Sequence, residues 1–120
     1  MRPGDLIAFS GYFMDSHLIN VLSYGIPFFS ASHVGILGNH QDELLLFEST
    51  TLSDLPCRIQ GKPVKGVQAV RLEDRLKSYQ GKVHHYPLVN PLTEEQDTFL
   101  STFLLAKIGT DYDYHGAVGN

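Results

Sequence analysis

The chain has 120 residues, a length typical of one domain, and its 13 acidic against nine basic residues give a net charge of -4. It contains no cluster of Lys and Arg that could neutralise phosphates, which argues against a nucleic-acid partner. A composition of 42% hydrophobic and 18% charged residues is typical of a globular domain, and a single cysteine, Cys57, excludes an internal disulfide.

The N-terminal part of the sequence predicts a turn followed by a strand and a short helix. Residues 3–5, Pro-Gly-Asp, form the turn, and the apolar residues 6–10 after it predict a buried strand. Asp15 or Ser16 can cap a helix of about two turns, which Gly25 would stop. The apolar run is too short for a signal peptide, and none approaches the ~20 residues of a membrane span.

The middle of the chain carries the strongest hairpin signal. Residues 34–37 and 44–49 are apolar runs, and the polar, turn-forming residues 38–43 separate them. Residues 50–66, rich in Pro and Gly, predict an irregular segment over the surface.

The remaining sequence predicts two strands and two helices. The strands are expected over residues 67–70 and 82–86, with a short polar helix over residues 72–79 between them. Thr93 and Gln96 form a capping box for the last helix. Its apolar stripe consists of Phe99, Leu100, Phe103, Leu104 and Ile108. The expected fold class is α+β, with four or five short, mostly antiparallel strands.

A histidine and a glutamate face each other in the predicted hairpin. If the turn is centred between residues 40 and 41, the numbers of facing residues sum to 81 and His33 lies opposite Glu48; a turn centred on residue 41 gives 82 and makes them near neighbours. Either register brings the two side chains within ~5–7 Å at Cβ. A carboxylate at the end of an apolar strand also needs a partner. The alternative is that backbone groups satisfy His33 and that solvent surrounds Glu48.

The other candidate residues give weaker signals. His84 and His85 are adjacent on a strand and point to opposite faces, so that they cannot chelate one ion, and no spacing matches a metal motif. We therefore expect neither a metal nor a cofactor. Cys57 lies in an irregular segment with only Arg58 as a nearby positive charge, which favours a buried structural thiol over a nucleophile.

Four segments together resemble a known family. Residues 3–7 (PGDLI), 32–36 (SHVGI), 46–50 (LFEST) and 109–114 (GTDYDY) resemble, in this order, motifs of the circularly permuted NlpC-type papain-like cysteine hydrolases, the YiiX/YebB-like group. The four matches extend over nearly the whole chain. The resemblance implies that residues 1–120 form a single permuted papain-like domain, with a small, mostly antiparallel sheet or half-barrel and flanking helices.

The resemblance also assigns roles to individual residues. By position, His33 corresponds to the general base and Glu48 to the residue that orients it. Ser32, Tyr112 and Tyr114 are further candidates for substrate binding, although Tyr112 and Tyr114 could either line a cleft or form a surface turn. The substrates that the resemblance implies are peptides or acyl compounds. No cofactor is implied.

The sequence departs from the family at the nucleophile, because no cysteine follows Tyr114, where the family places the cysteine at the start of a helix. Three alternatives remain open. The chain is a truncated or split hydrolase, or it is a non-catalytic binding or structural module, for example of a phage particle, or Cys57 serves as a substitute nucleophile. Without the cysteine helix we expect an exposed apolar patch, and hence a homo-oligomer or a partner protein. The expected location is cytoplasmic or virion-associated.

Overall fold

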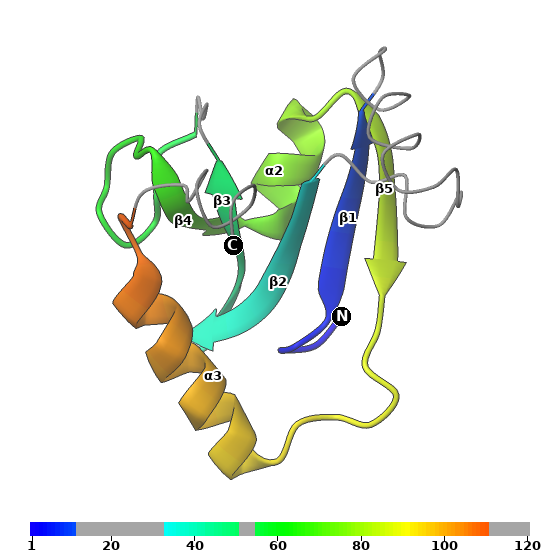
Figure 1. Ribbon diagram of the computed structural model, residues 1–120, viewed down its shortest axis with the longest axis vertical. Helices are drawn as coiled ribbons and strands as arrows, with labels where there is room; N and C mark the ends of the chain where they lie inside the picture. The colour runs from blue at the N-terminus through cyan, green and yellow to red at the C-terminus, as the bar shows by residue number, and fades with distance from the viewer. Residues whose placement is uncertain (12–32, 51–54, 111–120) are drawn as a thin grey trace, which may run out of the picture.

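The computed structural model describes residues 1–11, 33–50 and 55–110 (Figure 1). These residues form one five-stranded antiparallel sheet of strand order β4-β3-β2-β1-β5, together with two helices. The elements are β1 (Leu6–Gly11), β2 (His33–His40), β3 (Glu43–Thr50), β4 (Gly66–Arg71), α2 (Leu72–Ser78), β5 (Gly81–Tyr86) and α3 (Glu94–Lys107). The predicted α+β class is confirmed. The helix expected after Asp15 or Ser16 lies outside the described residues.

The sheet has a hydrophobic cluster on each of its two faces, because the strand side chains alternate between them. The cluster on the face covered by α2, here the α2 face, consists of Ile7, Phe9, Leu37, Leu46 and Val70. The cluster on the other face, here the α3 face, consists of Leu45, Phe47, Cys57, Ala69 and Leu104. Strand β3 is therefore apolar on both faces, as the sequence predicts.

The β2–β3 hairpin is tighter than the sequence predicts. Its turn contains only Gln41 and Asp42, which have φ values of 50° and 63°, as in the two-residue turns with two left-handed positions. Leu37 pairs with Leu46, so that facing residue numbers sum to 83 rather than to 81 or 82. The predicted register is therefore wrong by one or two residues. The strands also extend further toward the turn than expected.

Helices α2 and α3 occupy the predicted positions. In α3 the capping box is confirmed, since Thr93 Oγ1 accepts a hydrogen bond from Gln96 N at 3.1 Å and Thr93 N donates to Gln96 Oε1 at 3.0 Å. In α2 the residue after the helix, Tyr79, is already extended, so this helix ends without a left-handed glycine cap. No helix of the described ranges is long and apolar enough to cross a membrane.

The apolar stripe of α3 is predicted only in part. Leu104 is buried against the sheet, and the side chains that pack around it are partly buried Leu100, Leu105 and Ile108. Phe99 and Phe103 were expected on the same face, but they are 75% and 51% exposed. The helix thus contacts the sheet along a line rotated away from these two aromatic residues.

Candidate functional site

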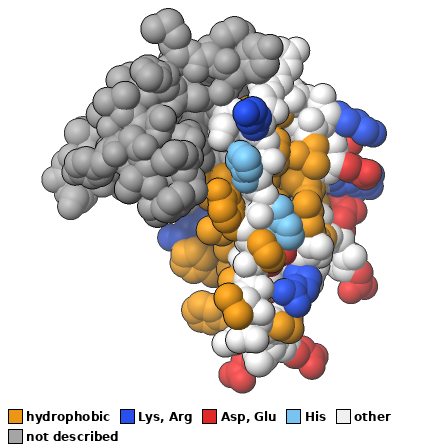
Figure 2. All heavy atoms as spheres, turned by 90° about the vertical axis from the view of Figure 1, so that its right-hand side faces the viewer, with side chains coloured by type: hydrophobic (Ala, Val, Ile, Leu, Met, Phe, Trp, Pro, Cys, Tyr) orange, Lys and Arg blue, Asp and Glu red, His pale blue; other side chains and the backbone are white. Residues whose placement is uncertain are grey.

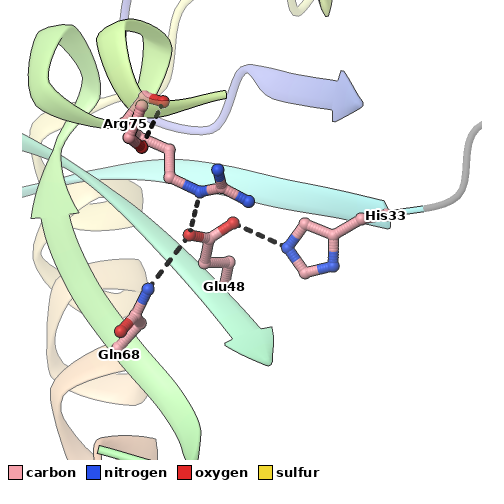
Figure 3. Close-up of polar contacts among 5 residues, drawn as sticks. His33, Glu48, Gln68 and Arg75 are labelled. Carbon is pink, nitrogen blue, oxygen red and sulfur yellow. Dashed lines mark hydrogen bonds and ion pairs between the residues drawn. The ribbon is translucent and has the colours of Figure 1, made fainter. Parts of the chain in front are cut away.

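His33 and Glu48 contact each other on the α2 face, as the sequence predicts (Figure 3). His33 Nε2 lies 2.6 Å from Glu48 Oε2. In the observed register the position that faces Glu48 is residue 35 rather than residue 33, so the imidazole reaches the carboxylate diagonally. The predicted register with a sum of 81 differs from the observed one by two residues and therefore keeps both side chains on one face, whereas the register with a sum of 82 differs by one and would have placed them on opposite faces.

Gly35 lies on β2 opposite Glu48, at the position that the diagonal contact from His33 passes. A Cβ atom at Gly35 would lie 2.6 Å from Leu46 Cδ1 and 3.1 Å from the carbonyl oxygen of Phe47. A side chain at this position would therefore force Leu46 to move and would crowd the backbone of β3.

Glu48 is a buried carboxylate with three polar partners. Its side chain is 0% exposed, and its Oε1 accepts hydrogen bonds from Arg75 Nε at 2.7 Å and from Gln68 Nε2 at 3.1 Å. Burial raises the pKa of Glu48, but the hydrogen bond from His33 and the charge and hydrogen bond of Arg75 outweigh it and lower the pKa below its usual range. Glu48 is therefore ionised at neutral pH.

The ionised carboxylate determines which nitrogen of His33 can act as a base. Since Glu48 Oε2 can only accept, His33 Nε2 must carry the hydrogen, and the lone pair of a neutral ring is on Nδ1. Figure 3 shows this second nitrogen pointing away from Glu48. The His33 side chain is 23% exposed, so the ring is not fully enclosed by the core. This arrangement can accept a proton and return it.

Arg75 and Gln68 are members of the site that the sequence reasoning did not find. Arg75 comes from α2, and its Cζ lies 4.6 Å from the ring centroid of Phe9 and 5.2 Å from that of Tyr79. Gln68 comes from β4, where it pairs with Glu48 and is 1% exposed. A polar residue inside the apolar run of residues 67–70 could have indicated a buried partner for Gln68, whereas nothing in the local sequence indicates Arg75.

Cys57 is separated from His33 by the sheet. It is 0% exposed, belongs to the cluster on the α3 face, and its Sγ accepts a hydrogen bond from Ala69 N at 3.4 Å. His33, by contrast, contacts Glu48 and Phe9 on the α2 face. The structure confirms the expected burial of Cys57 and does not bring it together with the candidate base.

A second histidine–carboxylate pair links Asp5, just before β1, to β5. His85 Nε2 lies 2.7 Å from Asp5 Oδ2, which also accepts from Arg2 N, while Leu88 N donates to Asp5 Oδ1. Burial raises the pKa of Asp5, but these hydrogen bonds together outweigh it and lower the pKa to about 2. Two of the three hydrogen bonds to Asp5 are donated by backbone N–H groups, so Asp5 connects the start of the chain to the segment around His85 and Leu88. The sequence reasoning did not find it.

The remaining predicted site residues, Ser32, Tyr112 and Tyr114, lie outside the described residues. Over residues 1–11, 33–50 and 55–110, no group of three or more His, Cys, Asp or Glu side chains could hold a metal ion.

Comparisons of the chain with protein-family models, with curated proteins and with solved structures find no match.

Proposed function

We propose that this chain carries the general base and the orienting carboxylate of a thiol hydrolase that acts on amide or ester bonds, in a domain of the permuted NlpC-type papain-like class. The observation that carries the proposal is the contact of His33 Nε2 with the buried, ionised Glu48 at 2.6 Å. It fixes the ring and leaves Nδ1 as the proton acceptor. The order of the four sequence motifs supports the choice of class.

In the proposed reaction His33 Nδ1 takes the proton of a thiol, and the thiolate forms a bond to the carbonyl carbon of the substrate. Collapse of the tetrahedral intermediate breaks the bond to the leaving amine or alcohol, which receives the proton from the His33 imidazolium. Water then attacks the thioester with His33 again as the base, and the acid and the free thiol are released. Glu48 remains ionised throughout and holds the ring.

The thiol in this proposal comes from outside residues 1–120, as a split or truncated hydrolase requires. The single cysteine of the sequence, Cys57, lies in the core on the α3 face. A partner chain or a continuation of this chain would have to bring its thiol to the exposed side of His33.

An added small thiol tests whether His33 is a competent base. The chain is mixed with 2-mercaptoethanol and 4-nitrophenyl acetate, and formation of the S-acetyl product is followed as a function of protein concentration. General-base catalysis contributes at least a factor of about 100 in evolved sites, and we expect a protein-dependent acceleration of at least about tenfold for an untethered thiol. His33→Gln and Glu48→Gln should remove most of it.

The matched control is His84→Gln, because His84 lies on β5 and is exposed but has no carboxylate partner among the described residues. It should retain the acceleration. The proposal is contradicted if the unaltered chain does not accelerate the reaction, or if His33→Gln accelerates it as much as the unaltered chain does.

A second candidate function is a non-catalytic binding or structural module of an assembly such as a phage particle. It is favoured by the apolar surface on the α3 face, where a hollow of about 320 Å³ is lined in part by Leu6, Val34 and Phe103. These three side chains are 41%, 49% and 51% exposed. Figure 2 views the molecule from its β5 side and shows further hydrophobic side chains on either side of the histidines. An apolar surface of this kind suits a protein partner.

A further inference from the structure

We propose that the two terminal nitrogens of Arg75 form a binding site for a carboxylate beside His33, and that the substrate carries a free carboxylate next to the amide or ester bond to be cleaved. This inference rests on the proposed function for the cleavage step, whereas the carboxylate site itself can be tested without any turnover.

The guanidinium of Arg75 is fixed before any ligand arrives. Its Nε donates to Glu48 Oε1 at 2.7 Å. The rings of Phe9 and Tyr79 meet nearly edge to face, with centroids 4.9 Å apart, and form a corner against which the guanidinium rests. The Arg75 side chain is 18% exposed. A ligand therefore meets a preformed group and does not have to order a flexible side chain.

The terminal nitrogens are the part of Arg75 that remains available. Neither makes a hydrogen bond within the described part of the chain, since only Nε is used. In Figure 3 they lie beyond Nε, and one of them is on the side of the guanidinium toward His33. Two parallel N–H groups at the end of a guanidinium match the two oxygens of a carboxylate.

The proposed carboxylate site and the candidate base His33 are adjacent, because both Arg75 and His33 contact Glu48. Arg75 and His33 bind the two oxygens of the same carboxylate, that of Glu48. A ligand carboxylate held by the terminal nitrogens of Arg75 consequently lies beside the His33 ring. A small acid whose carboxylate is adjacent to an amide, such as N-acetylglycine, can place its carbonyl group near His33 while Arg75 holds the acid.

Charge limits the affinity of this site. Glu48 already balances the positive charge of Arg75, so a bound carboxylate relies on the directed hydrogen bonds of the fork more than on net charge. We therefore expect millimolar dissociation constants for a minimal ligand. A lysine at position 75 would keep the charge beside Glu48 but would lose the planar fork.

The test compares two ligands that differ only in the carboxylate. N-acetylglycine and N-acetylglycinamide are titrated into the ¹⁵N-labelled chain at constant ionic strength, and the signals of Arg75 Nε–H and the His33 ring are followed. We expect saturable shifts with N-acetylglycine and at least tenfold weaker binding of the amide. Arg75→Lys should weaken binding of the acid at least tenfold, while Arg71→Lys, an exposed arginine paired with Glu43, should leave it unchanged.

Equal affinity for the two ligands, or an Arg75→Lys variant that binds the acid normally, overturns the carboxylate site. If Arg75→Lys does not fold, as judged by its circular dichroism, the comparison of the two ligands on the unaltered chain still decides. Acetate is titrated as a third ligand, and binding of acetate as tight as that of N-acetylglycine overturns the requirement for an adjacent amide. Because no turnover is measured, a chain that binds the acid but fails in the thiol assay separates this site from the proposed function.

Discussion

Arg75 on α2 and Glu48 on β3 are joined by a hydrogen bond of 2.7 Å, although 27 residues separate them in the sequence. The other oxygen of the same carboxylate holds His33 at 2.6 Å. The helix therefore takes part in placing the imidazole, and a displacement of α2 would be transmitted to His33 through a single buried carboxylate.

Replacement of Glu48 by glutamine should destabilise the protein. The amide cannot balance the charge of Arg75, whose side chain is 18% exposed, and it offers only one acceptor for three donors. Removing one member of a buried ion pair typically costs about 3 kcal/mol, and we expect a loss of this order in the free energy of unfolding, measured with urea.

The control for this variant is Glu43→Gln. Glu43 also pairs with two arginines, Arg58 and Arg71, but it lies at the surface. Its replacement should shift the urea midpoint much less, since water screens exposed ion pairs. Equal shifts for the two variants would mean that the buried network contributes no more than a surface pair.

The carboxylate of Asp5 should make the stability of the protein depend on pH in the acid range. Its pKa is lowered from 3.8 to about 2 on folding, so its contribution is fully present above the unfolded pKa and is lost as the pH falls from about 4 to about 2. The contribution amounts to about 2 kcal/mol. Asp5→Asn should lose it at neutral pH and show a flatter stability profile below pH ~4. Thermal melts at several pH values measure this profile.

Asp42→Asn is the control, because Asp42 is exposed in the hairpin turn and asparagine tolerates its positive φ. It should keep the acid dependence of the unaltered chain. If the stability of Asp5→Asn depends on pH in the same way as that of the unaltered chain, the negative charge of Asp5 does not stabilise the fold through its contacts with His85 and Leu88.

The thiol of Cys57 should be unreactive in the folded protein. It is 0% exposed, so a disulfide reagent should modify it only when the protein unfolds, at a rate that rises with urea concentration. A thiol-directed acyl probe should likewise leave the folded chain unlabelled. Rapid labelling of Cys57 that disappears in His33→Ala would contradict the structure and make Cys57 the nucleophile.

The two-residue turn between β2 and β3 should be open to stabilisation. Gln41 and Asp42 both have positive φ, a backbone conformation that favours glycine and, among residues with a side chain, asparagine and aspartate. Changing them to Asn-Gly should raise the free energy of unfolding by about 0.5–1 kcal/mol. Asp42→Val should lower it, and a gain from the valine would contradict the assigned turn geometry.

The apolar surface on the α3 face should lead to self-association or to a complex. Phe99 and Phe103 are exposed on α3, and Leu6 and Val34 are exposed on the same face of the sheet. Light scattering at tens of micromolar should detect a homo-oligomer, and Phe103→Lys should shift it toward the monomer. A monodisperse monomer in the unaltered chain would count against this expectation.

Local patterns were sufficient to predict most of the described elements. Alternation and apolar runs located the strands, and the Thr93–Gln96 capping box located the start of α3. The register of the hairpin was not predictable, because Gln41 and Asp42 do not resemble the Asn-Gly pair that usually marks such a turn. The contact between His33 and Glu48 was nevertheless predicted, since it requires only that both lie on one face.

The rest of the site depends on contacts that no local pattern contains. Arg75 reaches Glu48 across 27 residues and His85 reaches Asp5 across 80, and both depend on how distant elements pack. Similarly, the periodicity of α3 identified an apolar stripe but not the angle at which it meets the sheet, so Phe99 and Phe103 were assigned to the core although they are exposed.

The place of β1 in the sheet has a consequence for the order of assembly during protein synthesis. Phe9 pairs with His33 on one side and with Val83 on the other, so β1 needs a neighbour that is translated more than 70 residues after it. The sheet cannot close on a growing chain until β5 has left the ribosome. A pairing between residues so far apart in the sequence slows folding, and the unpaired edge of β1 stays available to chaperones in the interval.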